Sequence, residues 1–164
     1  KHLSDIIGTY AWALMPNHFH FLVRLKDDIA DEIITSDRFN SKSYMKLVRY
    51  DKKIHQYFSN LFNAYSKAFN KQESRHGTLF ERPFRKKQAN SKNYLIQVLL
   101  YIHNNPVRHG FVKKIEDYKW SSYQSYFSKQ EIELDIKEAI SWFDDLENLM
   151  YIHRKKANNL DFDI

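Results

Sequence analysis

The sequence predicts a mixed fold that combines a short antiparallel sheet with several amphipathic helices. Near the start of the chain, β-forming residues at 9–14 and an alternating run at 18–25 flank a Pro-Asn pair. Apolar residues then recur at helical spacing between residues 44 and 69, and again from residue 95 to residue 102. Alternation is typical of strands, and recurrence every three to four residues is typical of helices. With 164 residues, the chain has the length of one ordinary domain, with room for a small appendage.

The composition is that of a folded protein. Tyr and Phe number 11 and 12, whereas Gly and Pro number three each, which excludes a disordered or fibrous chain. The absence of cysteine excludes disulfides and thiolate metal sites, and a reducing cytosol is the expected compartment. No apolar run approaches the roughly 18 residues of a membrane-spanning helix. No signal peptide is visible either, so no membrane association is expected.

The net charge of +6 is concentrated in the middle of the chain. Residues 71–114 carry 10 basic and 2 acidic side chains, a net charge of +8, whereas residues 1–70 carry +3 and residues 115–164 carry −5. Clustered Lys and Arg attract phosphate groups, so this distribution favours a polyanion-binding surface on one part of the fold.

The first predicted element is a β-hairpin whose turn contains Pro16 and Asn17. Because successive side chains of a strand point to opposite faces, His18 and His20 share one face of the second strand. Phe19 and Phe21 share the other face of the strand, and we expect that face to pack against the core. Two imidazoles on one face provide half of a metal site, or they are two polar side chains on the solvated side of the sheet.

Helices account for most of the rest of the chain. Residues 26–43 lack a clean period and predict an exposed loop or a short helix, and the main helix is predicted at about 51–71 with an aromatic stripe in the core. A second helix is predicted within the segment 91–110, with Ser91 as its N-cap, and Pro106 is expected to end it. After an aromatic-rich loop, an amphipathic helix with an acidic outer face is predicted at 136–156.

A basic segment lies between the first two helices. Its cationic side chains are Arg82, Arg85, Lys86 and Lys87. Phe80 and Phe84 alternate with them, and Pro83 restricts the segment to an edge strand or a bulge. This mixture suits contact with a phosphate backbone and unstacked bases. It equally suits a sheet edge that is kept soluble by its charge.

Four segments, taken in order, resemble a known family. They are "ALMPNHFHFLV", "GTLFERPFRKK", "YIHNNPVRHGFV" and "DYKWSSY", and together they are similar to the HUH-type single-tyrosine transposases, most of all to the REP-associated tyrosine transposases. The resemblance covers roughly residues 8–127, and its specificity comes from the order and separation of the motifs. The sequence departs from the family in two places. The family's first strand and helix should precede residue 8, where only a stub is present, and residues 27–50 are longer and less regular.

The resemblance implies a ferredoxin-like or RNA-recognition-like α+β sandwich, with helices packed on an antiparallel sheet. It implies a catalytic domain at residues 1–127, incomplete at its N-terminus, and a helical appendage at 128–164. It also implies a divalent metal, Mg²⁺ or Mn²⁺, and cleavage of single-stranded DNA by a tyrosine, which leaves a 5′-phosphotyrosine and a free 3′-hydroxyl. A bacterial, cytoplasmic protein that works as a homodimer on hairpin-forming DNA is expected.

The family pattern assigns the metal ligands. His18 and His20 would supply two ligands from one strand face, although imidazole alone does not identify the metal. Asn105 stands at the family position of the third ligand, four residues after Tyr101, and its amide oxygen suits Mg²⁺ or Mn²⁺. The alternative for Asn105 is a helix C-cap. A metal ion polarises a phosphodiester and stabilises the charge that develops during attack.

Tyr101 is the expected nucleophile, because it opens the motif "YIHNNPV". A phenol is mostly protonated at neutral pH, so neighbouring cations would help it to react, and a covalent intermediate conserves the bond energy for rejoining. Tyr94, seven residues earlier on a similar helical face, is the alternative nucleophile. The remaining histidines lack a partner at ligand spacing or point elsewhere on their helices, and we expect packing or surface roles for them. They include His55, His76, His103, His109 and His153.

Three functions are compatible with these features. The first is an endonuclease and strand transferase acting on single-stranded DNA at or near hairpins. The second is a domesticated relative that binds a DNA hairpin without cutting it, and the third is a protein-interaction role for the acidic C-terminal helix. Only the first requires His18, His20 and Tyr101 together. All three are present, which favours the enzyme.

Overall fold

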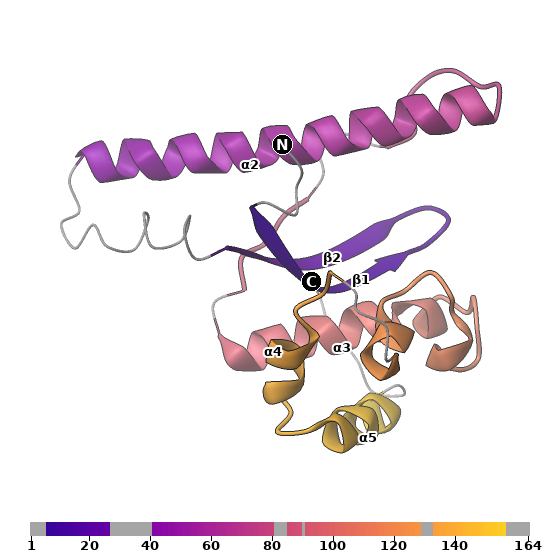
Figure 1. Ribbon diagram of the computed structural model, residues 1–164. Helices are drawn as coiled ribbons and strands as arrows, with labels where there is room; N and C mark the ends of the chain where they lie inside the picture. The colour runs from indigo at the N-terminus through magenta and orange to yellow at the C-terminus, as the bar shows by residue number, and fades with distance from the viewer. Residues whose placement is uncertain (1–5, 27–40, 81–84, 90, 129–132, 157–164) are drawn as a thin grey trace. The chain divides into compact units, whose positions relative to one another are not determined.

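The computed structural model describes residues 6–26, 41–80, 85–89, 91–128 and 133–156, and within the first long helix it describes side chains from His55 onward. The elements, in order, are β1 (Ile7–Leu14), β2 (Phe19–Leu25), α2 (Ser41–Gln72), α3 (Lys92–Arg108), the short 3₁₀ turns Ile115–Asp117 and Tyr123–Phe127, α4 (Ile136–Ser141) and α5 (Leu146–Lys156) (Figure 1). An antiparallel pair of strands with helices packed on it confirms the expected α+β class.

The chain divides into two compact units that are interleaved in sequence. The α2 unit comprises residues 1–6 and 26–87, and the sheet unit comprises residues 7–25 and 88–164. The hairpin therefore belongs with the C-terminal half of the chain, and residues 26–87 of the α2 unit separate it in sequence from α3. The division expected at residue 127 stays a prediction.

The predicted hairpin is confirmed. Strands β1 and β2 pair antiparallel, and the backbone N–H of Met15 donates to the carbonyl of His18 at 2.8 Å. This hydrogen bond closes a two-residue loop made of Pro16 and Asn17. The pairing places Ala13 opposite His20, with a register shift nearer the start of β1.

The core lies on the histidine face of β2, so the expectation that the phenylalanine face forms the core is wrong. Leu22, which shares the face of His20, is 6% exposed, and Ala11 and Ala13 beside them on β1 are fully buried. Phe21, on the opposite face, is 38% exposed. The two alanines explain the difference, because their small side chains let α3 approach this face of the hairpin closely.

Helix α3 begins as predicted and supplies much of the core. The Ser91 side chain accepts a hydrogen bond from the backbone N–H of Tyr94 at 3.2 Å, which confirms it as the N-cap. Leu99, Leu100 and Ile102 are at most 2% exposed, and they belong to the same hydrophobic cluster as the alanines of β1.

The sequence predicts that the helix ends at Pro106, but the helix continues to Arg108. A proline in the last turn costs one hydrogen bond of the helix. The end is then closed by backbone hydrogen bonds of 3.0 Å from Phe111 to Pro106 and from Gly110 to Val107. Gly110 has φ +72°, so the closure is a Schellman motif in which glycine adopts the left-handed conformation at no steric cost.

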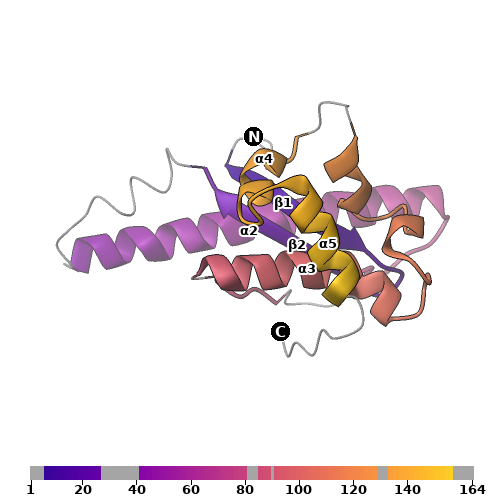
Figure 2. The same cartoon turned by 90° about the horizontal axis from the view of Figure 1, so that it is seen from below.

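The predicted single helix at 136–156 is wrong, because the chain forms the separate helices α4 and α5. Asp144 has φ +72°, which no helix accommodates, and Asp145 starts α5 by accepting a hydrogen bond from the backbone N–H of Asn148 at 2.7 Å. Figure 2 shows α5 alongside α3, with which it packs.

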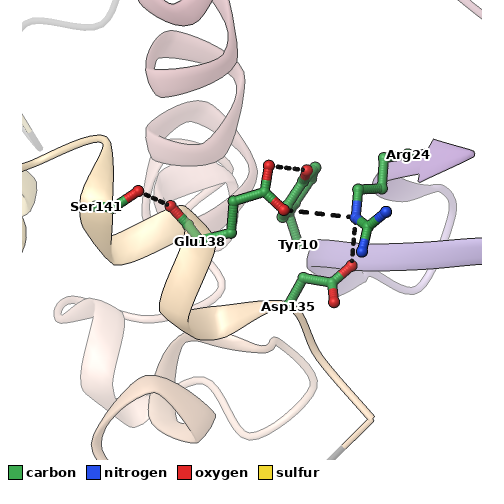
Figure 3. A network of polar contacts seen from close by, with 5 residues as sticks. All are labelled: Tyr10, Arg24, Asp135, Glu138 and Ser141. Atoms are coloured by element: carbon green, nitrogen blue, oxygen red, sulfur yellow. Dashed lines mark hydrogen bonds and ion pairs between the residues drawn. The ribbon is translucent and has the colours of Figure 1, made fainter. Parts of the chain in front are cut away.

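Polar contacts fasten the start of α4 to the sheet (Figure 3). Arg24 donates to Asp135 at 2.9 Å and lies 3.5 Å from Glu138, and the Tyr10 hydroxyl donates to Glu138 at 2.7 Å. Burial and this hydrogen bond both raise the pKa of Tyr10, so its hydroxyl keeps its proton. Gly8 makes room for these groups, since a Cβ there would collide with the Asp135 carboxylate.

In the other unit, α2 begins ten residues before its expected start at about residue 51. The Phe62 and Phe80 rings lie 5.1 Å apart, and the Asn70 side chain donates to the carbonyl of Gly77 at 2.8 Å, so the chain turns back along the helix. The aromatic stripe is only partly covered, because Tyr65 is 54% exposed. Most of the loop expected at 26–43 lies outside the described residues. None of the helices in the described ranges is long and apolar enough to span a membrane.

Candidate active site between the hairpin and helix α3

Tyr101 and His20 meet where α3 packs on the histidine face of β2. Their ring centroids are 5.3 Å apart, with the rings nearly perpendicular. Tyr101 is partly buried, and its neighbours on the buried side of α3 belong to the core. The nucleophile and one of the metal ligands expected from the sequence are therefore brought together by packing between two distant segments.

His18 and His20 lie side by side, as their spacing predicts. Their ring centroids are 5.2 Å apart. His18 lies immediately after the hairpin turn, where its Nδ1 donates to the side-chain oxygen of Asn17 at 2.7 Å. This bond assigns the proton of a neutral His18 to Nδ1 and leaves the Nε2 lone pair for a ligand.

Both imidazoles are biased towards the neutral form. Burial lowers the pKa of His20 to about 4, with the nearby His18 and His109 acting in the same direction. Burial, followed by the charge of His109, also lowers the pKa of His18. The Nε2 of His20 is buried and makes no hydrogen bond with any described residue. A neutral imidazole with an uncommitted nitrogen is the form that binds a metal ion.

Asn105 is the second polar group at this site that is buried without a hydrogen bond to a described residue. The residue is 1% exposed, and neither its Oδ1 nor its Nδ2 makes a hydrogen bond of good geometry within the described chain. The amide nevertheless lies near His18 and slightly opposes the lowering of its pKa. The helix cap falls on His109, so the alternative of Asn105 as the C-cap is wrong. An unpaired buried amide is costly, which points to a ligand that it would bind.

His109 is a site residue that the sequence analysis missed. It is exposed, and its ring centroid lies 4.9 Å from that of His18. The signal was available in the spacing of Tyr101, Asn105 and His109, which are four residues apart on one face of α3. It was hidden because only the folded chain shows that this face meets the turn of the hairpin.

The donor set fits a divalent ion through its chemistry. In the described part of the chain, no group of three His, Cys, Asp or Glu side chains is arranged to hold a metal ion. The set that remains is two imidazoles and one amide, of which the Nε2 of His20 and the Oδ1 of Asn105 lack hydrogen bonds. Nitrogen and amide-oxygen donors are compatible with Mn²⁺ and, for the amide, with Mg²⁺.

A buried chain of hydrogen bonds connects α3 to β1 and α5. The Trp12 backbone N–H donates to the Ser122 hydroxyl at 2.8 Å, and that oxygen lies 2.8 Å from Nε2 of His103. Nδ1 of His103 lies 3.0 Å from Nε2 of His153, whose Nδ1 donates to the Leu149 carbonyl at 2.8 Å. Because the carbonyl can only accept, a neutral His153 accepts from Nδ1 of His103, which leaves the Nε2 lone pair of His103 facing the Ser122 hydroxyl. The same hydroxyl also lies 3.2 Å from the carbonyl oxygen of Trp12.

The predicted DNA-binding residues lie in the α2 unit. Arg85, Lys86 and Lys87 are exposed, as a phosphate-binding role requires, whereas Arg82 lies outside the described residues. The alternative nucleophile, Tyr94, is partly buried in the first turn of α3.

Known proteins provide a comparison for this arrangement. The chain is similar to a transposase. A Haemophilus influenzae protein named "Putative REP-associated tyrosine transposase" is 27% identical over 117 residues, which cover 70% of this chain and 58% of the relative. The chain thus spans little more than half the length of that protein. No family model matches the sequence, and no solved structure matches it.

Proposed function

We propose that the protein is a transposase-like enzyme that cuts and rejoins single-stranded DNA, at or near hairpins, with Tyr101 as the nucleophile. The observation that carries the proposal is the packing of Tyr101 against His20, 5.3 Å between ring centroids, beside the unpaired Asn105 amide. A tyrosine that only fills the core would not require a half-buried histidine and an amide without hydrogen bonds beside it. The similarity to a protein named as a tyrosine transposase supports the same class of enzyme.

The reaction would follow from the position of the phenol. The Oη of Tyr101 attacks the phosphorus, the Oη–P bond forms and the P–O3′ bond breaks. The phenol loses one proton and the departing 3′-oxygen gains one, so the products are a 5′-phosphotyrosine and a free 3′-hydroxyl. Reversal by a 3′-hydroxyl rejoins a strand without any added energy source.

His18, His20 and Asn105 are the residues that would hold a divalent ion, Mg²⁺ or Mn²⁺. When bound, such an ion supplies Lewis-acid polarisation of the phosphate and stabilises its developing charge. The chain's own contribution is to keep both imidazoles neutral through burial and to hold Tyr101 against His20. Arg82, Arg85, Lys86 and Lys87 would bind the DNA backbone, since exposed cations of this kind contact phosphates without reading sequence.

The test is the covalent adduct. Wild-type protein incubated with labelled single-stranded hairpin DNA and Mn²⁺ should give a slower band on a denaturing gel, and mass spectrometry should place the nucleotide on Tyr101. Tyr101→Phe removes only the hydroxyl, so the ring still packs on His20. This variant should bind the hairpin like wild type and form no adduct.

Two further tyrosine variants complete the design. Tyr151→Phe is the matched control, because Tyr151 is a 59% exposed tyrosine on α5, and it should form the adduct normally. An adduct that persists in Tyr101→Phe and disappears in Tyr94→Phe would move the nucleophile to Tyr94. A wild-type protein that binds hairpins tightly with Mn²⁺ but forms no adduct on any substrate would instead be a hairpin-binding relative without cleavage activity.

A further inference from the structure

Arg108 lies over the ring of the proposed nucleophile. Its guanidinium carbon is 5.4 Å from the centroid of the Tyr101 ring. Arg108 follows Tyr101 by seven residues, two turns along α3, so both side chains stand on the same face of the helix. The Tyr101 ring is thus contacted edge-on by His20 and approached by a permanent cation.

The charge of Arg108 is available for a ligand. The side chain is exposed, and no described carboxylate forms an ion pair with it. Arg24, in contrast, is engaged by both Asp135 and Glu138. Arg108 also sits in the last turn of α3, where any basic side chain stabilises the helix end. A lysine would serve that purpose equally well, so the helix end alone does not require a guanidinium.

We propose that Arg108 binds the scissile phosphate through its non-bridging oxygens and stabilises both the attack of Tyr101 and the resulting phosphotyrosine. This inference rests on the proposed function and names a further catalytic residue for it. A phosphorus atom that bonds to Tyr101 Oη must lie beside the hydroxyl end of the ring, and the guanidinium carbon of Arg108 lies over the same ring, 5.4 Å from its centroid. The planar guanidinium can donate two parallel hydrogen bonds to two phosphate oxygens, which a lysine cannot do.

The role of Arg108 is purely electrostatic. It donates hydrogen bonds and keeps its own proton throughout, while the Oη–P bond forms and the P–O3′ bond breaks as described above. Charge moves onto the phosphate oxygens in the transition state, and a donor already aimed at them favours that state over the ground state. The same oxygens remain in the adduct, so the contact also persists until the strand is rejoined.

The first measurement is the single-turnover rate of adduct formation on labelled hairpin DNA with Mn²⁺. Arg108→Met should lower this rate about 10²-fold, the usual effect of losing one preorganised donor. Arg108→Lys keeps the charge and the stabilised helix end but loses the two parallel hydrogen bonds of the guanidinium, so it should recover only part of the rate. Full activity of Arg108→Lys, together with a lowered melting temperature of Arg108→Met, would reduce Arg108 to a helix-end residue and overturn the proposal.

The second measurement does not depend on cleavage. In the Tyr101→Phe background, hairpin oligonucleotides with a single neutral methylphosphonate, moved one phosphate at a time along the flanking strand, are compared by affinity. One position should lose affinity about tenfold, because a charge-assisted hydrogen bond is lost there. Adding Arg108→Met should abolish that penalty at the same position and leave all others unchanged. An identical profile with and without Arg108 would show that it contacts no phosphate.

A matched control separates this effect from loss of charge in general. Lys155 on α5 lies 5.7 Å from the Tyr151 ring centroid, so Lys155→Met removes one cation from one exposed tyrosine. It should change neither the adduct rate nor the methylphosphonate profile. If wild type forms adduct and Arg108→Met forms it equally fast, the inference fails while the proposed function stands. If wild type never cuts but shows the Arg108-dependent penalty, the phosphate contact stands and the proposed cleavage fails.

Discussion

At the scale of single residues, the site is defined by polar groups that the fold buries without satisfying. The Nε2 of His20 and both amide atoms of Asn105 are enclosed without hydrogen bonds to described residues, and each such group costs free energy in the folded protein. The cost brings no gain in packing, because a leucine at position 20 would fill the same face of β2 more favourably. We therefore interpret these atoms as positions where a ligand completes the structure.

Metal binding is the property that tests this interpretation. His18→Ala and His20→Ala should each abolish the heat of Mn²⁺ binding in titration calorimetry, because each removes one of three donors. The fold should survive, since His18 lies at the turn and His20 at the rim of the core. His76→Ala is the matched control, because His76 is exposed in the α2 unit. Wild-type binding heats in both site variants would leave the two histidines with no role as ligands.

The same residues show what the sequence could and could not predict. The alternation of side chains along a strand placed His18 and His20 on one face. The preference of serine for the N-cap position placed Ser91 at the start of α3. The alternation could not say which face α3 covers, since that depends on Ala11 and Ala13 in the partner strand. For the same reason, His109 was missed: its neighbour His18 is distant in sequence, and only tertiary packing joins them.

At the scale of elements, α3 carries the proposed reactive groups on one side and is held by buried hydrogen bonds on another. His103, two residues after Tyr101, is fully buried and links Ser122 to His153 of α5. The orientation of Tyr101 is therefore tied to two segments beyond residue 120. Sequence patterns identified α3 as a helix but could not reveal this tie, because a histidine on an apolar face gives no sign of its partner.

Stability should depend on pH through this pair of histidines. Burial lowers the pKa of His153 to about 4 and that of His103 well below its usual value, so the folded protein holds both neutral. In the unfolded chain they take up protons near pH 6.5. Protonation therefore favours unfolding: the stabilisation is complete above about pH 6.5 and is lost as the pH falls towards 4. For His153 this corresponds to about 1.4 kcal/mol of unfolding free energy per pH unit within that range, and His103 acts in the same direction.

Urea denaturation of wild type and His153→Gln between pH 7.5 and 4.5 measures this effect. Glutamine preserves a donor and an acceptor but does not titrate, so the variant should lose stability less steeply with falling pH. His76→Gln, at an exposed site, should keep the slope of wild type. A wild-type unfolding free energy that stays constant from pH 7 to pH 5 would contradict the neutral, buried pair.

At the scale of the whole molecule, the positive charge and the proposed chemistry belong to different units. Residues 1–6 and 26–87 carry 15 basic and 9 acidic side chains, whereas residues 7–25 and 88–164 carry 11 of each. The whole net charge of +6 thus belongs to the α2 unit. Counting along the sequence obscured this division, because four of the basic residues within 71–114 belong to the sheet unit and offset its acidic C-terminal part; they are Lys92, Arg108, Lys113 and Lys114. We infer that long-range attraction of DNA is a property of the α2 unit and that the sheet unit acts at close range.

The salt dependence of DNA binding tests that division. Arg85→Gln combined with Lys86→Gln removes two exposed cations of the α2 unit, and Lys137→Gln combined with Lys155→Gln removes two from the sheet unit. Both variants are made in the Tyr101→Phe background, so that binding is measured without cleavage.

If both α2-unit cations bind phosphates, the slope of log K against log salt should flatten by roughly 1.4, about 0.7 for each cation that no longer neutralises a phosphate of the single strand. The sheet-unit variant should keep the wild-type slope, because Lys137 and Lys155 lie on α4 and α5, outside the basic segment that is proposed to bind the DNA backbone. Equal slopes in all three proteins would mean that the basic segment only keeps an exposed edge soluble, and the source of DNA affinity would then have to be sought among the cations of α3, beginning with Arg108.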